Sequence, residues 1–260
     1  MIRALRTAAS GMKAQETRVD VIANNLANVN TAGFKKTQAQ FQDLLYQTLR
    51  PAGVSEFQGQ YVPGEMQVGH GVKLASTQKI FTQGNFTQTE NQLDLAIEGR
   101  GFFKIMKGTE EVYTRDGSFK LNEEGYIVDS QGNRLQPEIA IPVTASTITI
   151  DSGGSLTALD ENGAVVATGQ INTYDFVNPA GLLSDGNNYF TATEASGDAV
   201  EGTPGVDGLG TVLQGSLESS NISVVEEMVN MIVGQRAYEA NSKIIKTSDD
   251  MLQIANNVKA

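Results

Sequence analysis

The stretch that decides the fold is residues 23–36, ANNLANVNTAGFKK, where an apolar-periodic run ends in four closely spaced asparagines. Asparagine is a mediocre helix former and a good cap or turn residue, because its side chain competes for nearby backbone groups. Gly33 and Phe34 follow the asparagines. The stretch therefore predicts a helix end and a turn. Its amides favour hydrogen bonding to another surface over catalysis, which would need histidine, cysteine or paired carboxylates.

Upstream of this turn, residues repeat with a period of seven in two columns. They are Leu5, Met12, Val19 and Leu26, and then Ala8, Gln15, Ile22 and Val29. Such a repeat, with one polar interruption, places a single stripe along one side of a helix. We expect a helix of about 28 residues, which is roughly 40 Å long at 1.5 Å per residue.

The C-terminal end has a similar seven-residue repeat. Its main column is Leu217, Val224, Met231, Tyr238, Ile245 and Leu252, and a second column that starts at Met228 becomes polar after it. Residues 219–223 offer N-caps, and Glu226 and Glu227 suit the positive end of a helix dipole. A helix from about residue 223 to 257 is expected.

These patterns predict an α+β protein in which the two terminal helices pack on each other as a coiled-coil domain. The alternative is a two-helix satellite packed on the central domain. We divide the chain into an N-terminal helix (1–33), a linker with a short helix and a long ribbon (34–76), a central β domain (77–216) and a C-terminal helix (217–260). Phe41, Leu44, Leu45 and Leu49 suggest the short helix.

The middle of the chain switches to a period of two with recurrent glycine, asparagine and aspartate turns. Residues 93–106 predict two strands around a glycine-marked break, and 117–135 predict a hairpin with its tip at 122–125. Residues 154–171 and 180–193 predict further strand–turn–strand units. This density of strands indicates a compact antiparallel barrel or sandwich-like domain.

Composition excludes several classes of function. The 260 residues have a formal charge of −11 and no cysteine. An acidic surface lacks the cationic footprint that nucleic acid or an anionic membrane requires. No stretch approaches the roughly 20 apolar residues of a membrane span, and no signal peptide is visible. We expect no nucleic-acid partner and no direct membrane insertion.

Catalytic signals are weak. His70 is the only histidine and is interpreted as a loop residue. Gly99 and Gly101 lack the rest of a dinucleotide fingerprint. A glycan- or peptidoglycan-active enzyme would need a carboxylate pair in a cleft. Its candidates Asp116, Glu123 and Glu124 resemble turn residues. We therefore expect a non-enzyme without cofactor or metal.

Residues 10–36, SGMKAQETRVDVIANNLANVNTAGFKK, resemble the N-terminal signature of bacterial flagellar rod and hook proteins. Residues 224–257 resemble the C-terminal signature of that family. The motifs LAIEGRGFF (95–103) and YTRDGSFKLNEEGYIVDSQGNRLQP (113–137) resemble its inner β domain. Within the family, the length of the chain and the insertion at 46–72 favour the distal rod, and a proximal-rod or hook protein is the alternative.

The resemblance implies a structural subunit that self-assembles into a rigid hollow helical tube, transmits motor torque to the hook and surrounds the export channel. Implied partners are further copies of the chain, other rod proteins, the hook protein and the surrounding basal-body ring proteins. It also implies a rod crossing the periplasm and type III export without a cleaved signal peptide. The expected subunit-packing residues are Leu5, Met12, Val19, Ile22, Asn24, Asn25, Leu26, Asn28, Asn30, Gly33, Phe34, Val224, Met228, Met231, Tyr238, Ile245 and Leu252.

Overall fold

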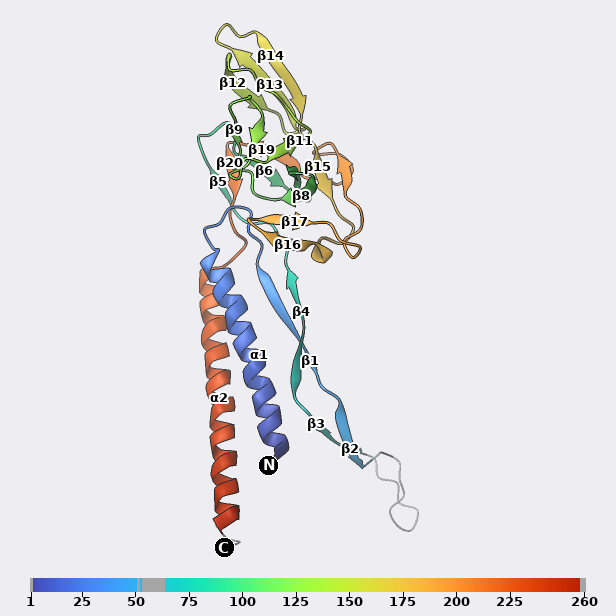
Figure 1. The fold of residues 1–260 in the computed structure, drawn as a ribbon, viewed down its shortest axis with the longest axis vertical. Helices are drawn as coiled ribbons and strands as arrows, with labels where there is room; N and C mark the ends of the chain where they lie inside the picture. The colour runs from blue at the N-terminus through green and yellow to red at the C-terminus, as the bar shows by residue number, and fades with distance from the viewer. Residues whose placement is uncertain (1, 51, 53–63, 258–260) are drawn as a thin grey trace. The chain divides into compact units, whose positions relative to one another are not determined.

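The backbone passes four times between two units, which the computed structural model describes over residues 2–50, 52 and 64–257. The helix–ribbon unit comprises the chain up to Leu26, Thr37–Gln78 and the chain from Ser223 onward. The β unit comprises Ala27–Lys36 and Lys79–Ile222. Figure 1 shows the elements of each unit. The α+β class predicted from the sequence is confirmed.

Two antiparallel helices, α1 (Ile2–Ala27) and α2 (Val224–Asn257), lie side by side in the helix–ribbon unit (Figure 1). A Cβ added at Gly11 would lie 2.9 Å from Asn241 Nδ2, and one added at Gly234 would lie 3.1 Å from Val19 Cγ2. Later positions on α1 thus meet earlier positions on α2. The predicted extents of both helices are confirmed.

The face that α2 presents to α1 is small and polar. Its buried residues are Glu227, Gly234 and Ser248, which stand at intervals of seven and fourteen residues. Gly234 permits the close approach to Val19, because any side chain there would meet the valine methyl. Ser223 begins the helix, since its Oγ accepts a hydrogen bond from the Glu226 amide at 3.5 Å.

The ribbon of this unit consists of two antiparallel strand pairs. Strand β1 (Thr37–Asp43) pairs with β4 (Val72–Lys79), and β2 (Tyr46–Arg50) pairs with β3 (Met66–Gly69). The short helix predicted around Phe41–Leu49 is therefore wrong. A helix of this length is marginal by itself, whereas a partner strand satisfies every second backbone group of β1. Pro51 and 53–63, within the predicted insertion, lie outside the described residues.

The β unit contains one seven-stranded sheet, one three-stranded sheet and three strand pairs. The seven-stranded sheet has the order β16-β17-β8-β7-β11-β10-β9, the three-stranded sheet is β12-β13-β14, and the pairs are β15–β18, β19–β6 and β20–β5. None of the sheets in the described part of the chain closes into a barrel. A short 3-10 helix spans Pro179–Gly181. The strands are β5 (Phe86–Gln88), β6 (Leu95–Glu98), β7 (Phe103–Lys107), β8 (Glu110–Thr114), β9 (Lys120–Leu121), β10 (Ile127–Val128), β11 (Arg134–Gln136), β12 (Ala145–Ile150), β13 (Ser155–Asp160), β14 (Val165–Gln170), β15 (Thr173–Asp175), β16 (Leu183–Gly186), β17 (Tyr189–Thr191), β18 (Val200–Gly202), β19 (Thr211–Gln214) and β20 (Ser216–Glu218).

The predicted hairpins are confirmed. Strands β9 and β10 flank the turn at 122–125, where the Asn122 side chain accepts hydrogen bonds from the Glu124 and Tyr126 amides. Strands β13 and β14 flank the acidic turn at 160–164. The break between β6 and β7 contains Gly99 and Gly101, as the sequence predicted.

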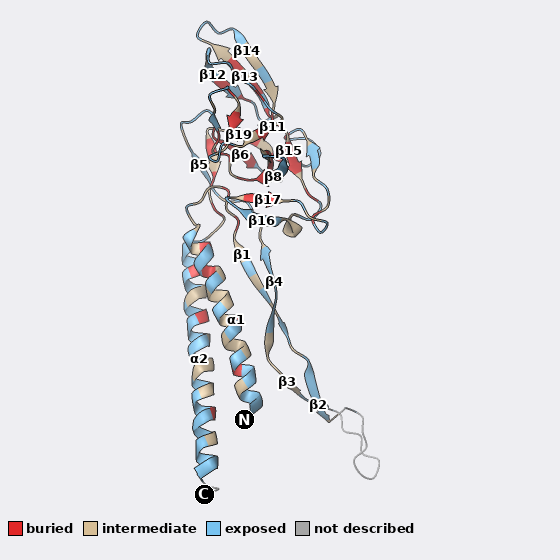
Figure 2. Cartoon of the chain, in the orientation of Figure 1, coloured by how far each residue is buried: buried red, intermediate tan, exposed pale blue. Residues whose placement is uncertain are grey.

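Two apolar clusters form the core of the β unit, which is the red interior in Figure 2. The larger cluster joins side chains of both larger sheets, for example Phe103 and Ile105 with Leu156. The smaller cluster is aromatic, and Phe102 and Phe176 pack edge to face with ring centroids 5.7 Å apart. Buried aromatic side chains of this kind dominate core energetics. This core supports a buried polar site in the same unit.

Candidate functional site

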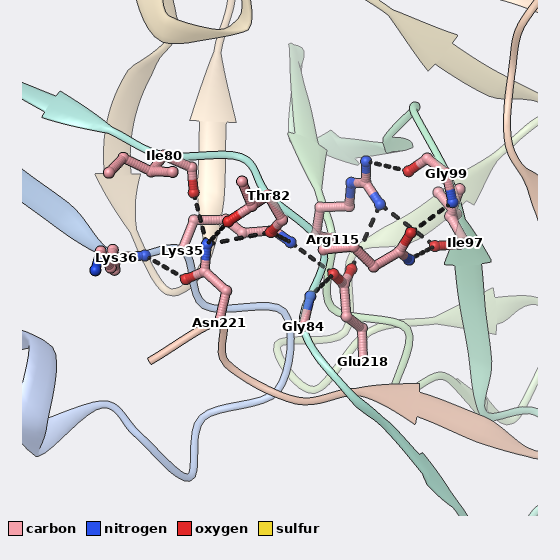
Figure 3. A network of polar contacts seen from close by, with 11 residues as sticks. Lys35, Lys36, Ile80, Thr82, Gly84, Ile97, Gly99, Arg115, Glu218 and Asn221 are labelled. Carbon is pink, nitrogen blue, oxygen red and sulfur yellow. Dashed lines mark hydrogen bonds and ion pairs between the residues drawn. The ribbon is translucent and has the colours of Figure 1, made fainter. Parts of the chain in front are cut away.

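Four polar side chains gather in the β unit where three chain segments leave it for the helices and the ribbon. We call Lys35, Arg115, Glu218 and Asn221 the clasp (Figure 3). Lys35 lies in the segment that follows α1, and Glu218 and Asn221 lie in the segment that precedes α2. Arg115 follows β8. The clasp thus joins residues that are far apart in the sequence.

Glu218 is the centre of the clasp. Its Oε1 accepts hydrogen bonds from Lys35 Nζ at 2.6 Å and from the Gly84 amide at 2.9 Å. Its Oε2 lies 3.4 Å from Arg115 Nη1. Pairing of β20 with β5 fixes the position of Glu218, which is opposite Phe86 in that ladder. The carboxylate therefore binds three segments from one firmly held strand.

The charges of the clasp are almost completely removed from water. The side chains of Lys35 and Glu218 are 0% exposed and that of Arg115 is 4% exposed. Burial, the main influence, lowers the pKa of the Lys35 ammonium, and Glu218 opposes this shift. Burial also lowers the pKa of the Arg115 guanidinium, and Glu218 and then Asp175 oppose this shift. Glu218 is thus the main counter-charge of both buried cations.

Backbone carbonyls supply further acceptors, although Arg115 Nε is buried without one. Lys35 Nζ donates to the Thr82 carbonyl at 2.9 Å, and Arg115 Nη2 donates to the Gly99 carbonyl at 2.8 Å. These bonds partly compensate the second cation. Because Lys35 and Glu218 have no exposed side-chain surface, no substrate reaches them. The arrangement holds chain segments together and performs no chemistry.

Asn221 ties the same segments through backbone groups. Its Oδ1 accepts a hydrogen bond from the Lys36 amide at 2.8 Å, and its Nδ2 donates to the Ile80 carbonyl at 2.8 Å. The Ile80 amide in turn donates to the Lys36 carbonyl at 2.9 Å. An amide side chain offers both donors and an acceptor, so one residue bridges the three segments without a further charge.

The turn in residues 23–36 packs beside the clasp. Gly33 is buried, and its amide donates to the Glu218 carbonyl at 2.8 Å. The preceding Ala32 carbonyl accepts a hydrogen bond from Asn188 Nδ2 at 3.1 Å. Phe34 is half-buried, with Lys79 Nζ 4.8 Å from its ring centroid. The segment 27–36 is therefore an integral part of the β unit.

One of the four asparagines performs a separate task in the helix–ribbon unit. Asn25, in the last turn of α1, is only 1% exposed. Its Nδ2 donates to the Thr37 carbonyl and its Oδ1 accepts from the Thr37 amide, both at 2.9 Å. Nδ2 also lies 3.5 Å from Glu227 Oε2 of α2. Asn25 thus joins α1, β1 and α2.

Replacing Asn25 with alanine is expected to loosen this joint. The Thr37 amide and carbonyl would lose their partners at a cost of about 2 kcal/mol, which corresponds to roughly thirtyfold faster exchange of the Thr37 amide. Hydrogen–deuterium exchange of the assembled chain measures this effect. Asn30→Ala is the matched control, because Asn30 is exposed and its replacement should stay within about 0.5 kcal/mol. Equal exchange in both variants would contradict the assigned role.

The structure places the predicted packing residues at very different depths. Ile22, Asn25 and Gly33 are buried, whereas Asn24, Asn30, Val224, Met228 and Tyr238 are exposed, and the other nine are half-buried: Leu5, Met12, Val19, Leu26, Asn28, Phe34, Met231, Ile245 and Leu252. Apolar periodicity does not identify Glu227, Gly234 and Ser248 as buried. The sequence signal that could have identified them is the seven-residue spacing of small or polar residues. Apolar periodicity does not identify the clasp residues either.

The other face of α2 is apolar and exposed. Seven side chains define this exposed apolar face: Val225, Val229, Ile232, Val233, Ile244, Met251 and Ile254 are all at least 47% exposed. At 3.6 residues per turn Val225, Val229, Ile232 and Ile254 lie on the side of α2 opposite Glu227, Gly234 and Ser248, whereas Val233, Ile244 and Met251 lie on its flanks. Figure 2 shows α2 largely in the colour of exposed residues. Several large apolar side chains of α2 therefore face away from α1.

The residues considered for catalysis have local structural roles. His70 Nδ1 lies 3.0 Å from the Leu45 carbonyl. Asp116 Oδ1 accepts hydrogen bonds from Ser118, and Glu124 pairs with Arg134 at 2.7 Å. Within residues 2–50, 52 and 64–257, no group of three or more histidine, aspartate or glutamate side chains is placed to hold a metal ion. Neither described helix is long and apolar enough to cross a membrane.

Comparison with known proteins matches three families along the chain. The "Flagella basal body rod protein" family matches residues 5–35, the "Flagellar hook protein FlgE/F/G D1 domain" matches 96–158, and the "Flagellar basal body rod FlgEFG protein C-terminal" family matches 213–258. The chain is 51% identical over 264 residues to "Flagellar basal-body rod protein FlgG" of Borreliella burgdorferi, covering 100% of this chain and 99% of that protein. It is 47% identical to the FlgG protein of Caulobacter vibrioides, with 100% of both chains covered. "Flagellar hook-basal body complex protein FlhP" of Bacillus subtilis is 29% identical, again with 100% of both chains covered.

Proposed function

Because this chain belongs to the flagellar basal-body rod protein family, we propose that it is the structural subunit of a flagellar distal rod. It assembles into a rigid hollow helical tube that carries motor torque to the hook and surrounds the export channel. The family is structural and not enzymatic. The rod crosses the periplasm and contacts other rod proteins, the hook protein and ring proteins. Its subunits leave the cytoplasm by the flagellar export route without a cleaved signal peptide.

The exposed apolar face of α2 is the observation that carries this proposal. Ile232 is 57% exposed and Val233 is 51% exposed, although both lie more than two turns inside the helix. A helix normally turns such side chains toward a core, and exposed apolar side chains clustered on a helix mark a contact surface. In a tube of identical subunits, the partner of this face is another copy. Contacts between two different patches extend a helical filament when the rotation between copies does not close into a ring.

The predicted packing residues and domain divisions belong to the same proposal. In the tube, the heptad columns of α1 and α2 pack in coiled-coil fashion, and the half-buried Leu5, Met12 and Met231 become fully buried. The four divisions 1–33, 34–76, 77–216 and 217–260 then serve as inner helix, ribbon, β layer and inner helix. The clasp holds the segments that connect these layers.

Electron microscopy of the purified chain at increasing concentration tests the proposal. The expected product is a straight tube with an axial channel, accompanied by slow amide exchange across α1 and α2 that the monomer lacks. Monomers whose helices stay equally protected at every concentration would overturn it, because their apolar face would then need no partner.

Shortening the 46–72 ribbon is expected to soften the tube. Gln47 and Val68 are register partners of β2 and β3, so replacing residues 48–67 with Asn-Gly would close the pair with a two-residue turn. If the ribbon braces neighbouring subunits along the axis, the bending stiffness measured from tube curvature should fall several-fold toward that of a flexible hook. Replacement of Asn162 by alanine in the β13–β14 turn is the control. An unchanged stiffness in the shortened chain would contradict the bracing role.

A further inference from the structure

A groove with a volume of about 380 Å³ opens between α1 and α2 in the helix–ribbon unit. Its lining combines carboxylates with apolar side chains. The lining residues used here are Gln15, Glu16, Val19 and Asp20 of α1, and Tyr238 and Glu239 of α2. Neither the clasp nor the exposed apolar face of α2 involves this groove.

The polar groups of the groove include hydrogen-bond acceptors that could bind a cationic side chain. Glu16 and Asp20 are exposed carboxylates, and buried Gln15 Oε1 has no hydrogen-bond partner in the described structure. Glu239 Oε2 lies 3.0 Å from Arg236 Nη1, but this pair is exposed and correspondingly weak. Val19 and the Tyr238 ring offer apolar surface for an aliphatic stem. The groove therefore suits an arginine or lysine side chain, whose stem is apolar and whose head is cationic.

The first turns of α1 carry cations that have no local counter-charge. Arg3 and Arg6 are exposed and three residues apart, so they project from the same side of the helix. The nearest carboxylate to either residue along α1 is Glu16. The described residues 2–50, 52 and 64–257 provide no ion pair for them. By contrast, Lys246 has Asp249 and Asp250 within four residues on the same helix.

We propose that Arg3 and Arg6 of one copy enter the Glu16–Asp20 groove of a second copy. The proposal rests on the self-assembly proposed above and names one of its contacts. Arg3 and Glu16 are separated by thirteen residues of helix, so two parallel copies displaced by about 20 Å along the helix axis bring them together. The donor and acceptor patches differ, and each copy carries both. The contact therefore repeats from copy to copy without closing.

Charge reversal in the full-length chain tests the contact. Arg3→Glu with Arg6→Glu, and separately Glu16→Lys with Asp20→Lys, should each raise the protein concentration needed for tube formation by at least about tenfold. The four substitutions together should return it to within about threefold of the wild-type value, because the attraction is restored with its sign exchanged. Asp249→Lys with Asp250→Lys is the control for general charge effects. A fourfold variant no better than its parents would overturn the contact.

Disulfide trapping locates the contact directly, because the chain has no cysteine of its own. Arg6→Cys and Asp20→Cys in one chain lie about 21 Å apart along the helix, too far for an internal disulfide but opposite each other in copies displaced by about 20 Å. Oxidation of assembled protein should therefore give a ladder of linked subunits, whereas either single variant stops at dimers. Absence of the ladder in tubes overturns this contact alone. Absence of tubes from the wild-type chain overturns the proposed function, and this contact with it.

Discussion

Replacing Gly33 with alanine is expected to release segment 27–36 from the β unit and to cost more than about 4 kcal/mol of unfolding free energy. Gly33 has a φ of +67°, and a Cβ added there would lie 2.5 Å from the Asp116 amide nitrogen and 2.6 Å from the Arg115 carbonyl carbon. Both neighbours are backbone atoms, which cannot rotate away as a side chain would. The segment also carries Lys35, so its release removes a partner from Glu218.

Gly108→Ala is the matched control for the backbone strain alone. Gly108 has a φ of +64°, and a Cβ added there would meet nothing within 4 Å. Its replacement should cost only about 1 kcal/mol, the strain of a left-handed alanine. Urea unfolding and amide exchange of residues 33–36 measure the difference. In cells, the bulkier Gly33→Val should block rod assembly. Equal unfolding midpoints for the two alanine variants, or normal motility with Gly33→Val, would refute the docking argument.

Neutralising Glu218 is expected to be the next most damaging change. Glu218→Gln preserves the shape of the side chain but leaves the Lys35 cation buried without a counter-charge and Arg115 with only the attraction of Asp175. Removing one partner of a buried ion pair typically costs 3–5 kcal/mol, because the remaining charge cannot reach water, and we expect about 4 kcal/mol here. Denaturant unfolding monitored by tyrosine fluorescence measures the loss.

Two further variants separate charge burial from general damage. Asp185→Asn removes the exposed pair with Lys107, whose side chains are 43% and 42% exposed, and should cost less than about 1 kcal/mol. Lys35→Met added to Glu218→Gln removes one of the two stranded cations and should recover part of the loss, so the two changes are not additive. If Glu218→Gln costs no more than Asp185→Asn, Glu218 does not neutralise the buried cations.

The sequence predicted the elements whose signals are local. The asparagine cluster ended α1 within a residue or two, and Ser223 with Glu226 began α2, because caps and dipole charges act within one helical turn. The turn at 122–125 and the β13–β14 turn were also recognisable, since glycine and asparagine have specific turn conformations. The family resemblance then indicated the function, which the comparisons support.

What the sequence did not reveal depends on distant pairing. The apolar spacing over Phe41–Leu49 predicted a helix. The segment instead forms strands, because β4 and β3 provide hydrogen-bonding partners for its backbone. In the sequence, Lys35 is one of two adjacent lysines after Phe34. No feature of the neighbouring residues indicates that it pairs with Glu218. The α1–α2 contact at Gly234 and Ser248 was not predicted, because these residues are small or polar and apolar periodicity cannot detect a contact made by close approach.

The separation of the clasp residues along the chain governs when the clasp can close. Lys35 and Glu218 are 183 positions apart. For a polypeptide that emerges end first from a narrow conduit, the carboxylate and the ammonium are never outside together until everything between them has arrived. The clasp therefore cannot form until every residue from 35 to 218 has emerged, whichever end leads.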